Sequence, residues 1–432
     1  MNYDPNSSRS IRQKECIQKW IDSGCRACLQ LATGFGKTWI AILCIKRFLE
    51  INPKCKVDII VPTKFLKNQW SDLLKEQGLN KKCTVWVVNT AIRKTHKTDF
   101  LIIDEIHRFA SDSFFKIFNS FGYSMILGLT ATIERLDGKE TYITAYCPVV
   151  DIVTMDEAVA NGWLATSKIY KVVIDVPDIH IYREYEKQFM SSFSFFDFDF
   201  NLAMSCLTSV HYRRDYRKQL LRWNDYFDKN DKTRCDQLKE LVKECTSAVF
   251  QWNTALKKRK EFVFHHPKKF EIANKILQNR PYSKAITFNA TIKDCESYGF
   301  GYVIHSKNTN KQNETLLRDF NKAKYGVIHS SKSLNEGADI KGLNLAVILY
   351  NSSSSIERIQ RYGRVIRAEE GKVAEIFSII IRDTVEDKWF RKSAKNTDFI
   401  EIDESDLDAV LDYEKIQRVI HKQEDVKHLM TY

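Results

Sequence analysis

Aliphatic runs alternate with helical patterns along the first third of the chain. The runs are short and rich in β-branched residues, and they cover residues 28–31, 57–61, 85–88, 100–103 and 125–129. Between them, apolar residues recur at helical spacing over residues 10–21, 39–48 and 64–77. Strands that lack regular polar alternation are typical of a parallel sheet buried on both faces. The pattern therefore predicts an α/β domain with helices on both faces of the sheet.

The same alternation returns near the end of the chain. Strand-like runs occur at residues 285–288, 302–305, 325–329 and 345–350. A short helix over residues 153–164 and a strand over residues 168–176 come earlier, and residues 181–264 between the two parts carry mostly helical patterns. The pattern therefore predicts a second parallel-sheet domain interrupted by a helical insertion.

These patterns fix the expected domain boundaries. We expect domains at residues 1–152 and 153–395, with the helical insertion at about 181–264 in the second. Residues 396–432 form a charged tail, in which apolar residues recur at near-helical spacing over residues 406–429. The tail is expected to be a helix that packs on the second domain or binds a partner.

Length and charge narrow the class of protein. A chain of 432 residues has room for two or three domains, and its 44% hydrophobic content is that of a soluble globular protein. No apolar run is long enough to span a membrane, and the polar N-terminus lacks a signal-peptide core. The formal net charge of +12 favours a polyanionic partner. Eleven cysteines at scattered spacing favour a reducing cytoplasm.

A glycine-punctuated loop joins the first strand to the next helix. Residues 31–38 read LATGFGKT. Gly34 and Gly36 let backbone N–H groups converge on an anion at a helix N-terminus, Lys37 can reach the β- and γ-phosphates, and the Thr38 hydroxyl can hold Mg²⁺. The alternative is a glycine-rich turn with a buried lysine. The predicted ATP-binding residues here are Thr33, Gly34, Phe35, Gly36, Lys37 and Thr38.

Two carboxylates follow the predicted strand at residues 100–103. Asp104 can hold the Mg²⁺ that bridges the ATP phosphates, and Glu105 can orient and deprotonate the attacking water. An acidic pair at a strand end is otherwise a common helix cap. In combination with the upstream phosphate loop, the pair predicts ATP hydrolysis, with Asp104, Glu105 and Lys37 as catalytic residues.

At this point the sequence resembles a known family. LATGFGKT, VPTKFLKNQW (61–70), DEIH (104–107) and LTAT (129–132) look like motifs I, Ia, II and III of the DExH-type superfamily 2 helicases and translocases. The resemblance implies two RecA-like domains with ATP and Mg²⁺ in the cleft between them. It also implies that Pro62, Thr63 and Thr90 lie along a nucleic-acid backbone, and that Thr130 and Thr132 link hydrolysis to strand contact.

The resemblance also covers segments before and after these four motifs. Ile11-Arg12 looks like the start of the adenine-reading Q motif, with the expected glutamine displaced, so that Arg12 and Gln13 are implied nucleotide contacts. Residues 334–339 resemble motif V and residues 360–367, QRYGRVIR, resemble motif VI. These two motifs imply nucleotide or coupling contacts by Gly337 and Asp339, and catalytic contacts by Gln360, Arg364 and Arg367.

A narrower resemblance concerns the substrate. LTATIERLDG (129–138) is similar to the LTATPxRxDG of a group that contains phage UvsW-type branch-migrating helicases, the excision-repair helicase and restriction-type translocases, with Ile133 in place of the proline. It implies a monomeric helicase for forked or branched DNA, which would act in the host cytoplasm if a phage encodes it. The alternatives are an RNA helicase or transcript-releasing translocase, and an ATP-switched clamp that separates no strands.

The predicted insertion has two unusual compositions. Residues 189–200 contain six phenylalanines, and residues 211–222 and 257–269 mix basic with aromatic residues. Such mixtures suit phosphate contact and base stacking, so we expect Arg213, Arg214 and Arg217 to contact the duplex arm of a fork. The alternative is an insertion whose phenylalanines pack against the motor and whose basic face is only solvated.

Overall fold

The computed structural model describes residues 4–111, 113–133, 138–221, 231–331, 340–351, 373–394 and 398–413, apart from the side chains of Phe65, Asn310 and Ser393. The chain divides into two units. One comprises residues 1–172, 273–379 and 388–432 and holds nearly all of both sheets. The other comprises residues 173–272 and 380–387 and holds the helical insertion.

The first sheet has six parallel strands in the order β3-β2-β4-β5-β1-β6. They are β1 (Arg26–Leu31), β2 (Val57–Val61), β3 (Cys83–Val87), β4 (His96–Asp104), β5 (Phe121–Thr130) and β6 (Val149–Val153). The register places Asp104 beside Leu129 and Gln30 beside Thr130. The carboxyl ends of β4, β5 and β1 therefore lie next to one another.

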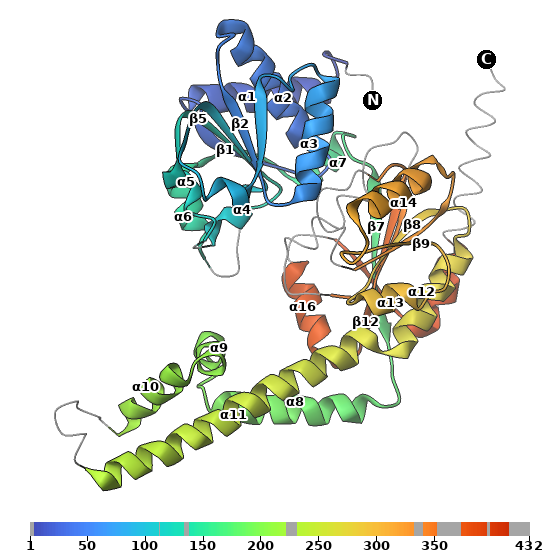
Figure 1. Cartoon of the computed structure of the whole chain (residues 1–432). Helices are drawn as coiled ribbons and strands as arrows, with labels where there is room; N and C mark the ends of the chain where they lie inside the picture. Colours follow the sequence, from blue (N-terminus) through green and yellow to red (C-terminus); the bar gives the residue numbers. More distant parts are fainter. Residues whose placement is uncertain are drawn as a thin grey trace. The chain divides into compact units, whose positions relative to one another are not determined.

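Helices cover both faces of this sheet (Figure 1). They are α1 (Ser8–Asp22), α2 (Lys37–Ile51), α3 (Lys64–Glu76), α4 (Val88–Ala91), η1 (Ile106–Ala110), α5 (Ile117–Ser120), α6 (Glu140–Tyr146) and α7 (Met155–Ala160). One core contains Trp20 of α1, Ile40 of α2 and Trp70 of α3, and the other contains Phe109 of η1 and Phe118 of α5. Successive strand residues contribute to opposite cores, as the pleat requires.

The second sheet has the strand order β13-β7-β12-β11-β8-β10-β9. Its strands are β7 (Thr166–Ile174), β8 (Lys284–Phe288), β9 (Tyr302–Ile304), β10 (Gly326–Ser330), β11 (Leu345–Ile348), β12 (Val373–Ile381) and β13 (Ile400–Asp403). The associated helices are α12 (Pro267–Asn279), α13 (Ile292–Glu296), α14 (Asn310–Lys322) and α16 (Val385–Ser393), with a short 3-10 helix, η3 (Glu404–Asp406). Apolar residues of β8, β10, β11 and β12 share one buried core. The predicted α/β class with two parallel sheets is confirmed.

The insertion consists of α8 (Ile179–Ser194), α9 (Phe200–Thr208), α10 (Val210–Leu220) and α11 (Lys232–His265). Its own core is built around Trp252, which is fully buried and stacks on Phe193 at 5.8 Å between ring centroids. Phe196 is also fully buried in this core, whereas Phe198 and Phe200 are about half exposed, at 54% and 50%. The phenylalanine-rich run therefore supplies part of the insertion's own core.

Two predicted segments differ from the structure. The helix expected over residues 153–164 begins only at Met155, because residues up to Val153 form β6 at the edge of the first sheet. Ala158, Trp163 and Leu164 then pack in the core of that sheet, beyond the boundary expected at residue 152. Of the helix predicted over residues 406–429, residues 407–413 are helical and residues 414–429 lie outside the described part of the chain.

Candidate active site

Three of the predicted motifs meet at the carboxyl edge of the first sheet. The glycine-rich loop follows β1, Asp104 ends β4, and Thr130 ends β5, which lies between those two strands. Ligands of open parallel sheets bind at this edge, because the loops that leave the strands there are free to form a site. The arrangement is that of a phosphate-binding site facing a pair of carboxylates.

Gly36 occupies a position that only glycine fits. It is the N-cap of α2 with φ at 107°, a left-handed conformation that strains a residue with a Cβ. A Cβ added there would also lie 2.6 Å from Nε2 of Gln13. The loop can therefore turn directly into α2 and point its N–H groups at an anion.

Helix α1 holds the loop from behind. Gln13 Nε2 donates to the carbonyl of Phe35 at 2.8 Å, Arg9 Nε donates to the same carbonyl at 3.1 Å, and Arg9 Nη2 donates to the carbonyl of Gly34. The Phe35 ring is buried and lies 5.3 Å from the ring of Trp163. The Phe35 backbone N–H is also engaged, because it donates to the carbonyl of Ala32 at 3.0 Å. With the carbonyls of Gly34 and Phe35 bound by α1, an anion at this loop would be held by backbone N–H groups other than that of Phe35.

Two side-chain oxygens at the site indicate what it is built to hold. Thr33 Oγ1 and Glu105 Oε2 are buried and have no hydrogen-bond partner among the described residues. Lys37 Nζ lies 3.4 Å from the carbonyl of Leu31, and Thr38 is half-buried in the first turn of α2. Buried polar atoms are normally satisfied, so a ligand with its own donors and charge belongs here. The residues fit Mg²⁺·ATP.

Asp104 is almost fully buried and doubly hydrogen-bonded. Its Oδ2 accepts from the indole Nε1–H of Trp70 at 2.9 Å, and its Oδ1 accepts from the backbone N–H of Glu105 at 3.0 Å. Burial and the neighbouring Glu105 carboxylate raise the pKa of Asp104 to about 6, although the Trp70 bond and the charge of Lys37 oppose them. A bound cation would favour the ionised form further, because it adds an opposite charge.

Glu105 adopts an unusual backbone conformation. Its φ is 52°, in the left-handed region that a residue with a side chain rarely occupies. Its Oε2 lies 3.5 Å from Nδ1 of His107, and that nitrogen lies 3.0 Å from Oγ1 of Thr130. Thr130 Oγ1 in turn donates to the carbonyl of Thr132 at 2.6 Å. Hydrogen bonds thus join His107 of the DEIH segment to the LTAT segment, and Glu105 Oε2 lies near the same imidazole without a hydrogen bond to it.

Comparison with known proteins agrees with this geometry. Residues 9–99 and 88–135 match the family model of the type III restriction enzyme res subunit, and residues 268–369 match the helicase conserved C-terminal domain. The DNA 3'-5' translocase XPB2 of Sulfurisphaera tokodaii is 25% identical over 88% of this chain and 83% of its own. A protein named as a helicase from Sulfolobus islandicus filamentous virus is 23% identical over 86% of this chain and 63% of its own.

The chain is a superfamily 2 helicase ATPase. It belongs to the ATP-dependent helicases and translocases that act on nucleic acid. Its fold is similar to that of S. cerevisiae Dbp5 bound to RNA and ADP BeF3, with a TM-score of 0.58 over 93% of this chain and 92% of that chain at 12% identity. That likeness confirms two RecA-like domains. No helix in the described ranges is long and apolar enough to cross a membrane.

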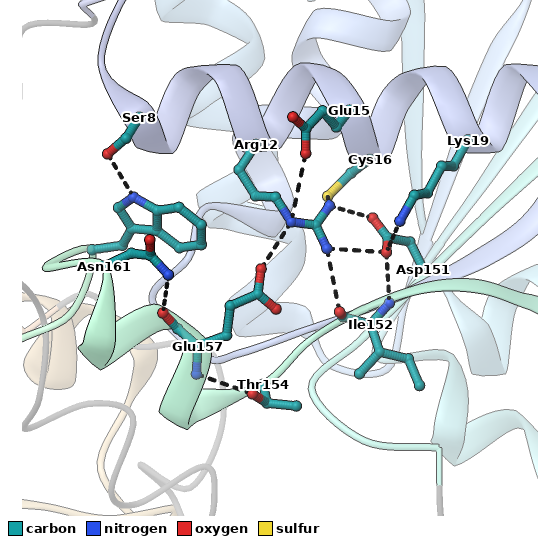
Figure 2. A network of polar contacts seen from close by, with 11 residues as sticks. Ser8, Arg12, Glu15, Cys16, Lys19, Asp151, Ile152, Thr154, Glu157 and Asn161 are labelled. Atoms are coloured by element: carbon teal, nitrogen blue, oxygen red, sulfur yellow. Dashed lines mark hydrogen bonds and ion pairs between the residues drawn. The ribbon is translucent and has the colours of Figure 1, made fainter.

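The helicase structure corrects the role inferred for Arg12. Figure 2 shows its guanidinium facing Asp151 of β6 and Glu157 of α7. Nη1 and Nη2 lie 2.5 and 3.0 Å from the Asp151 carboxylate oxygens, and Nε lies 2.9 Å from Glu157 Oε1. Lys19 also donates to Asp151 at 2.7 Å. Although burial acts in the opposite direction, the bonds from Arg12 and Lys19 lower the pKa of Asp151 to about 2.

Arg12 therefore ties α1 to β6 and α7 and has little capacity left for a nucleotide base. Its hydrogen bonds to Asp151 raise the pKa of the Arg12 guanidinium, which stays charged in this network. Gln13, the other implied adenine contact, donates to the phosphate loop instead, as described above. Both residues organise the site from α1, which the sequence pattern could not distinguish from direct contact.

The predicted nucleic-acid contacts of the first domain share one edge of the sheet. Pro62 and Thr63 follow β2, and Thr90 lies in α4 directly after β3, the neighbouring strand. Thr90 is exposed and Thr63 is half-buried, with its Oγ1 accepting from Leu66 N–H as the N-cap of α3. Pro62 is buried. The edge offers hydroxyl and backbone groups of the kind that contact phosphates.

The insertion corrects two further predictions. Arg213 and Arg217 are only 8% and 6% exposed. The Arg217 guanidinium lies 3.7 Å from the centroid of the Phe195 ring, and Arg213 Nη1 donates to the carbonyl of Cys206 at 3.0 Å. Buried against aromatic rings and backbone, these two side chains cannot also reach a phosphate, whereas Arg214 is exposed.

The second basic segment, residues 257–269, likewise contains both buried and exposed cations. Arg259 is buried between Glu186, at 2.7 Å, and the Phe189 ring, and Lys269 is buried against Glu386 at 2.7 Å. The exposed cations of this segment are Lys257, Lys258 and Lys260. Gly337, Asp339, Gln360, Arg364 and Arg367 lie outside the described residues.

Three residues that contact the site were not predicted. Arg9, Trp70 and His107 bond to the phosphate loop, to Asp104 and to Thr130. His107 stands in the DEIH motif itself and could have been singled out there. Trp70 ends the VPTKFLKNQW segment, but the resemblance implied roles there only for Pro62 and Thr63. The bonds of Arg9 and Trp70 could not be read from the sequence, because their partners are 26 and 34 residues away along the chain.

Proposed function

We propose that this protein is an ATP-dependent DNA helicase or translocase that acts on forked or branched DNA. The observation that carries the choice of DNA is the similarity to a DNA 3'-5' translocase over 88% of this chain. Phosphate contacts alone discriminate poorly between DNA and RNA. The arrangement of the residues at the sheet edge therefore favours neither nucleic acid.

The strand-end geometry supports the catalytic roles proposed for the first domain. The 33–38 loop holds the phosphates through backbone N–H groups and Lys37, and Glu105 accepts the proton of the attacking water. Thr38 and Asp104 are the residues that would hold Mg²⁺, which neutralises charge on the phosphates when bound. The described residues contain no group of three His, Cys, Asp or Glu side chains that could hold a metal ion.

The remaining roles come from sequence motifs outside the described residues. Arg364 and Arg367 are one helical turn apart in the QRYGRVIR motif, and planar guanidinium groups suit phosphate oxygens that gain charge in the transition state. Gln360 belongs to the same motif, and Gly337 and Asp339 to the preceding one. We assign the arginines to transition-state stabilisation and the other three to nucleotide or coupling contacts.

DNA contact is divided between the motor and the insertion. We assign Pro62, Thr63 and Thr90 to one strand, which is supported by their position after the neighbouring strands β2 and β3. Binding the second arm of a branched DNA requires protein surface outside the two sheet domains. The insertion has exposed cations at Arg214 and in residues 257–260. We assign these cations to the phosphates of a second arm.

The deciding experiment compares ATPase and unwinding on a DNA fork, a four-way junction, a linear duplex and an RNA duplex. Stimulation and unwinding should be largest with the fork or junction, and Lys37→Ala should abolish turnover on every substrate. Greater activity on RNA would replace DNA by RNA as the substrate. ATP turnover without displacement of any strand would indicate a clamp.

A further inference from the structure

The Asp104 carboxylate has a partner that no catalytic motif accounts for. The indole Nε1 of Trp70 lies 2.9 Å from Asp104 Oδ2. Trp70 is 1% exposed and Asp104 is 5% exposed, so the bond is shielded from water. A hydrogen bond from a neutral donor to an ionised carboxylate is stronger than one between neutral groups, and more so where water is excluded.

Helix α3 places this indole by packing alone. Leu66, Trp70 and Leu74 are spaced four residues apart and form the buried stripe of α3 on the first sheet. The ring fills the core while its N–H reaches the end of β4. Indole nitrogen is a donor only, so this group can never withdraw a proton from the carboxylate or compete with it for a cation.

The second carboxylate oxygen is held as well. Oδ1 accepts from the backbone N–H of Glu105 at 3.0 Å, so both oxygens have one fixed partner. An ionised carboxylate has about four lone-pair sites. Two fixed bonds define the plane of the group and leave the remaining sites in set directions. Without the indole bond, the carboxylate could rotate about its Cβ–Cγ bond.

We propose that Trp70 is a positioning residue for ATP hydrolysis: its indole N–H fixes the Asp104 carboxylate in the orientation that receives Mg²⁺ with the nucleotide. The inference rests on the role proposed above for Asp104. Residues that orient a metal ligand in this way contribute about 10- to 100-fold to metal affinity or activity.

The same sheet provides a matched control. Trp86 Nε1 donates to Asp58 Oδ1 at 2.7 Å, and Asp58 is 2% exposed. Asp58 lies near the start of β2, at the opposite end of the strand from the carboxyl edge that forms the site. Trp86→Phe therefore removes the same kind of bond from the same sheet, away from the ATP site.

The experiment measures metal-dependent nucleotide binding without turnover. The affinity for a fluorescent, non-hydrolysable ATP analogue is titrated against Mg²⁺, and again in EDTA, for the wild type, Trp70→Phe, Trp86→Phe and Asp104→Asn. For Trp70→Phe the Mg²⁺ concentration at half-effect should rise about 10- to 100-fold, with the affinity in EDTA unchanged. Trp86→Phe should follow the wild type. In steady-state assays, the kcat of Trp70→Phe should be restored in part by high Mg²⁺.

A rescue variant separates the hydrogen bond from packing. In Trp70→His, Nε2 is the same number of bonds from Cβ as the indole nitrogen and can keep the donor. Its Mg²⁺ dependence should lie closer to the wild type than that of Trp70→Phe. Should Trp70→Phe fail to fold, Trp70→Met, which fills irregular core space, replaces it as the variant without a donor.

Two failures are distinguishable. If Asp104→Asn leaves the Mg²⁺ dependence unchanged, the proposed role of Asp104 is wrong. If Asp104→Asn changes it while Trp70→Phe matches Trp86→Phe, Asp104 keeps its role and the positioning role of Trp70 is refuted. Equal shifts for Trp70→His and the variant without a donor would mean that the ring matters only by packing, which also overturns the inference.

Discussion

The carboxyl edge of the first sheet and the helical insertion both stood out in the sequence for their charged residues, and they use charge in opposite ways. At the sheet edge, Lys37 and Glu105 stand at the ends of buried elements and remain available to a ligand. In the insertion, Arg213, Arg217 and Arg259 point inward and pack on aromatic rings. A charged residue in a sequence therefore indicates binding only where the local fold determines whether its side chain points toward a ligand or into a core.

The difference has a physical cause. A residue that directly follows a buried parallel strand must lie at the carboxyl edge, whatever the rest of the fold does. On a helix, a cation points inward or outward according to what packs on that face. Arg213 and Arg217 are four residues apart and share one face of α10, and that face meets rings such as Phe195. Desolvated cation–π contacts of this kind can each be worth about 2 kcal/mol.

The largest predicted effect tests the sheet-edge half of the comparison. Glu105→Gln should keep ATP binding, because Asp104 and Lys37 are intact, but lower kcat about 10²- to 10⁴-fold because the attacking water loses its base. Glu240→Gln, an exposed change in α11 of the insertion, serves as the control and should leave basal turnover unchanged. Measurement of kcat and of ATP affinity for both variants checks this. Near wild-type turnover by Glu105→Gln would remove it as the base.

Much of the fold was predictable because aliphatic runs and turn residues act locally. Residues 57–61 were expected as a strand and form β2 with the same bounds. Residues 181–264 were expected to be mainly helical, and the helices of the insertion run from Ile179 to His265. The apolar run that forms β12 (Val373–Ile381) was visible, yet it was not recognised as a strand, because a short apolar run has no periodicity of its own.

The site was predictable only in part. The positions of Gly36, Asp104 and Glu105 follow from the strands and helix beside them. The bonds from Arg9, Gln13 and Trp70 depend on how α1 and α3 pack on the sheet, which no local pattern specifies. Arg12 was misinterpreted for the same reason, since its partner Asp151 is 139 residues away.

The second prediction tests the insertion half. Arg217→Ala should destabilise the insertion by about 2 kcal/mol, because the buried contact with the Phe195 ring is lost. Hydrogen exchange in α9, α10 and α11 should rise, while basal ATPase without DNA stays unchanged. The matched control is Arg214→Ala on the exposed face of the same helix, which should leave exchange as in the wild type. Equal protection in both variants would contradict a structural role for Arg217.

The smallest effect, and the most specific, concerns the cations that stay exposed. Arg214 is the one arginine of the three predicted contacts that can still reach a phosphate, so Arg214→Gln should weaken fork binding only a few-fold at physiological salt. Its clearer signature is the dependence of log Kd on log salt, whose slope should fall by about 0.9 for one lost phosphate contact on duplex DNA. The change should be absent with single-stranded DNA, which lacks the second arm.

Lys239→Gln is the control for this titration. Lys239 is an exposed cation of the same insertion, 71% exposed, but it is already paired with Asp236 at 2.8 Å, so its loss should change the slope less. Because Arg213 and Arg217 are buried, neutralising them would test folding and not contact, and they are left intact. If Arg214→Gln and Lys239→Gln give the same slope as the wild type on a fork, the exposed basic face of α10 is only solvated. Recognition of the branch would then have to come from residues 257–260 or from the motor itself.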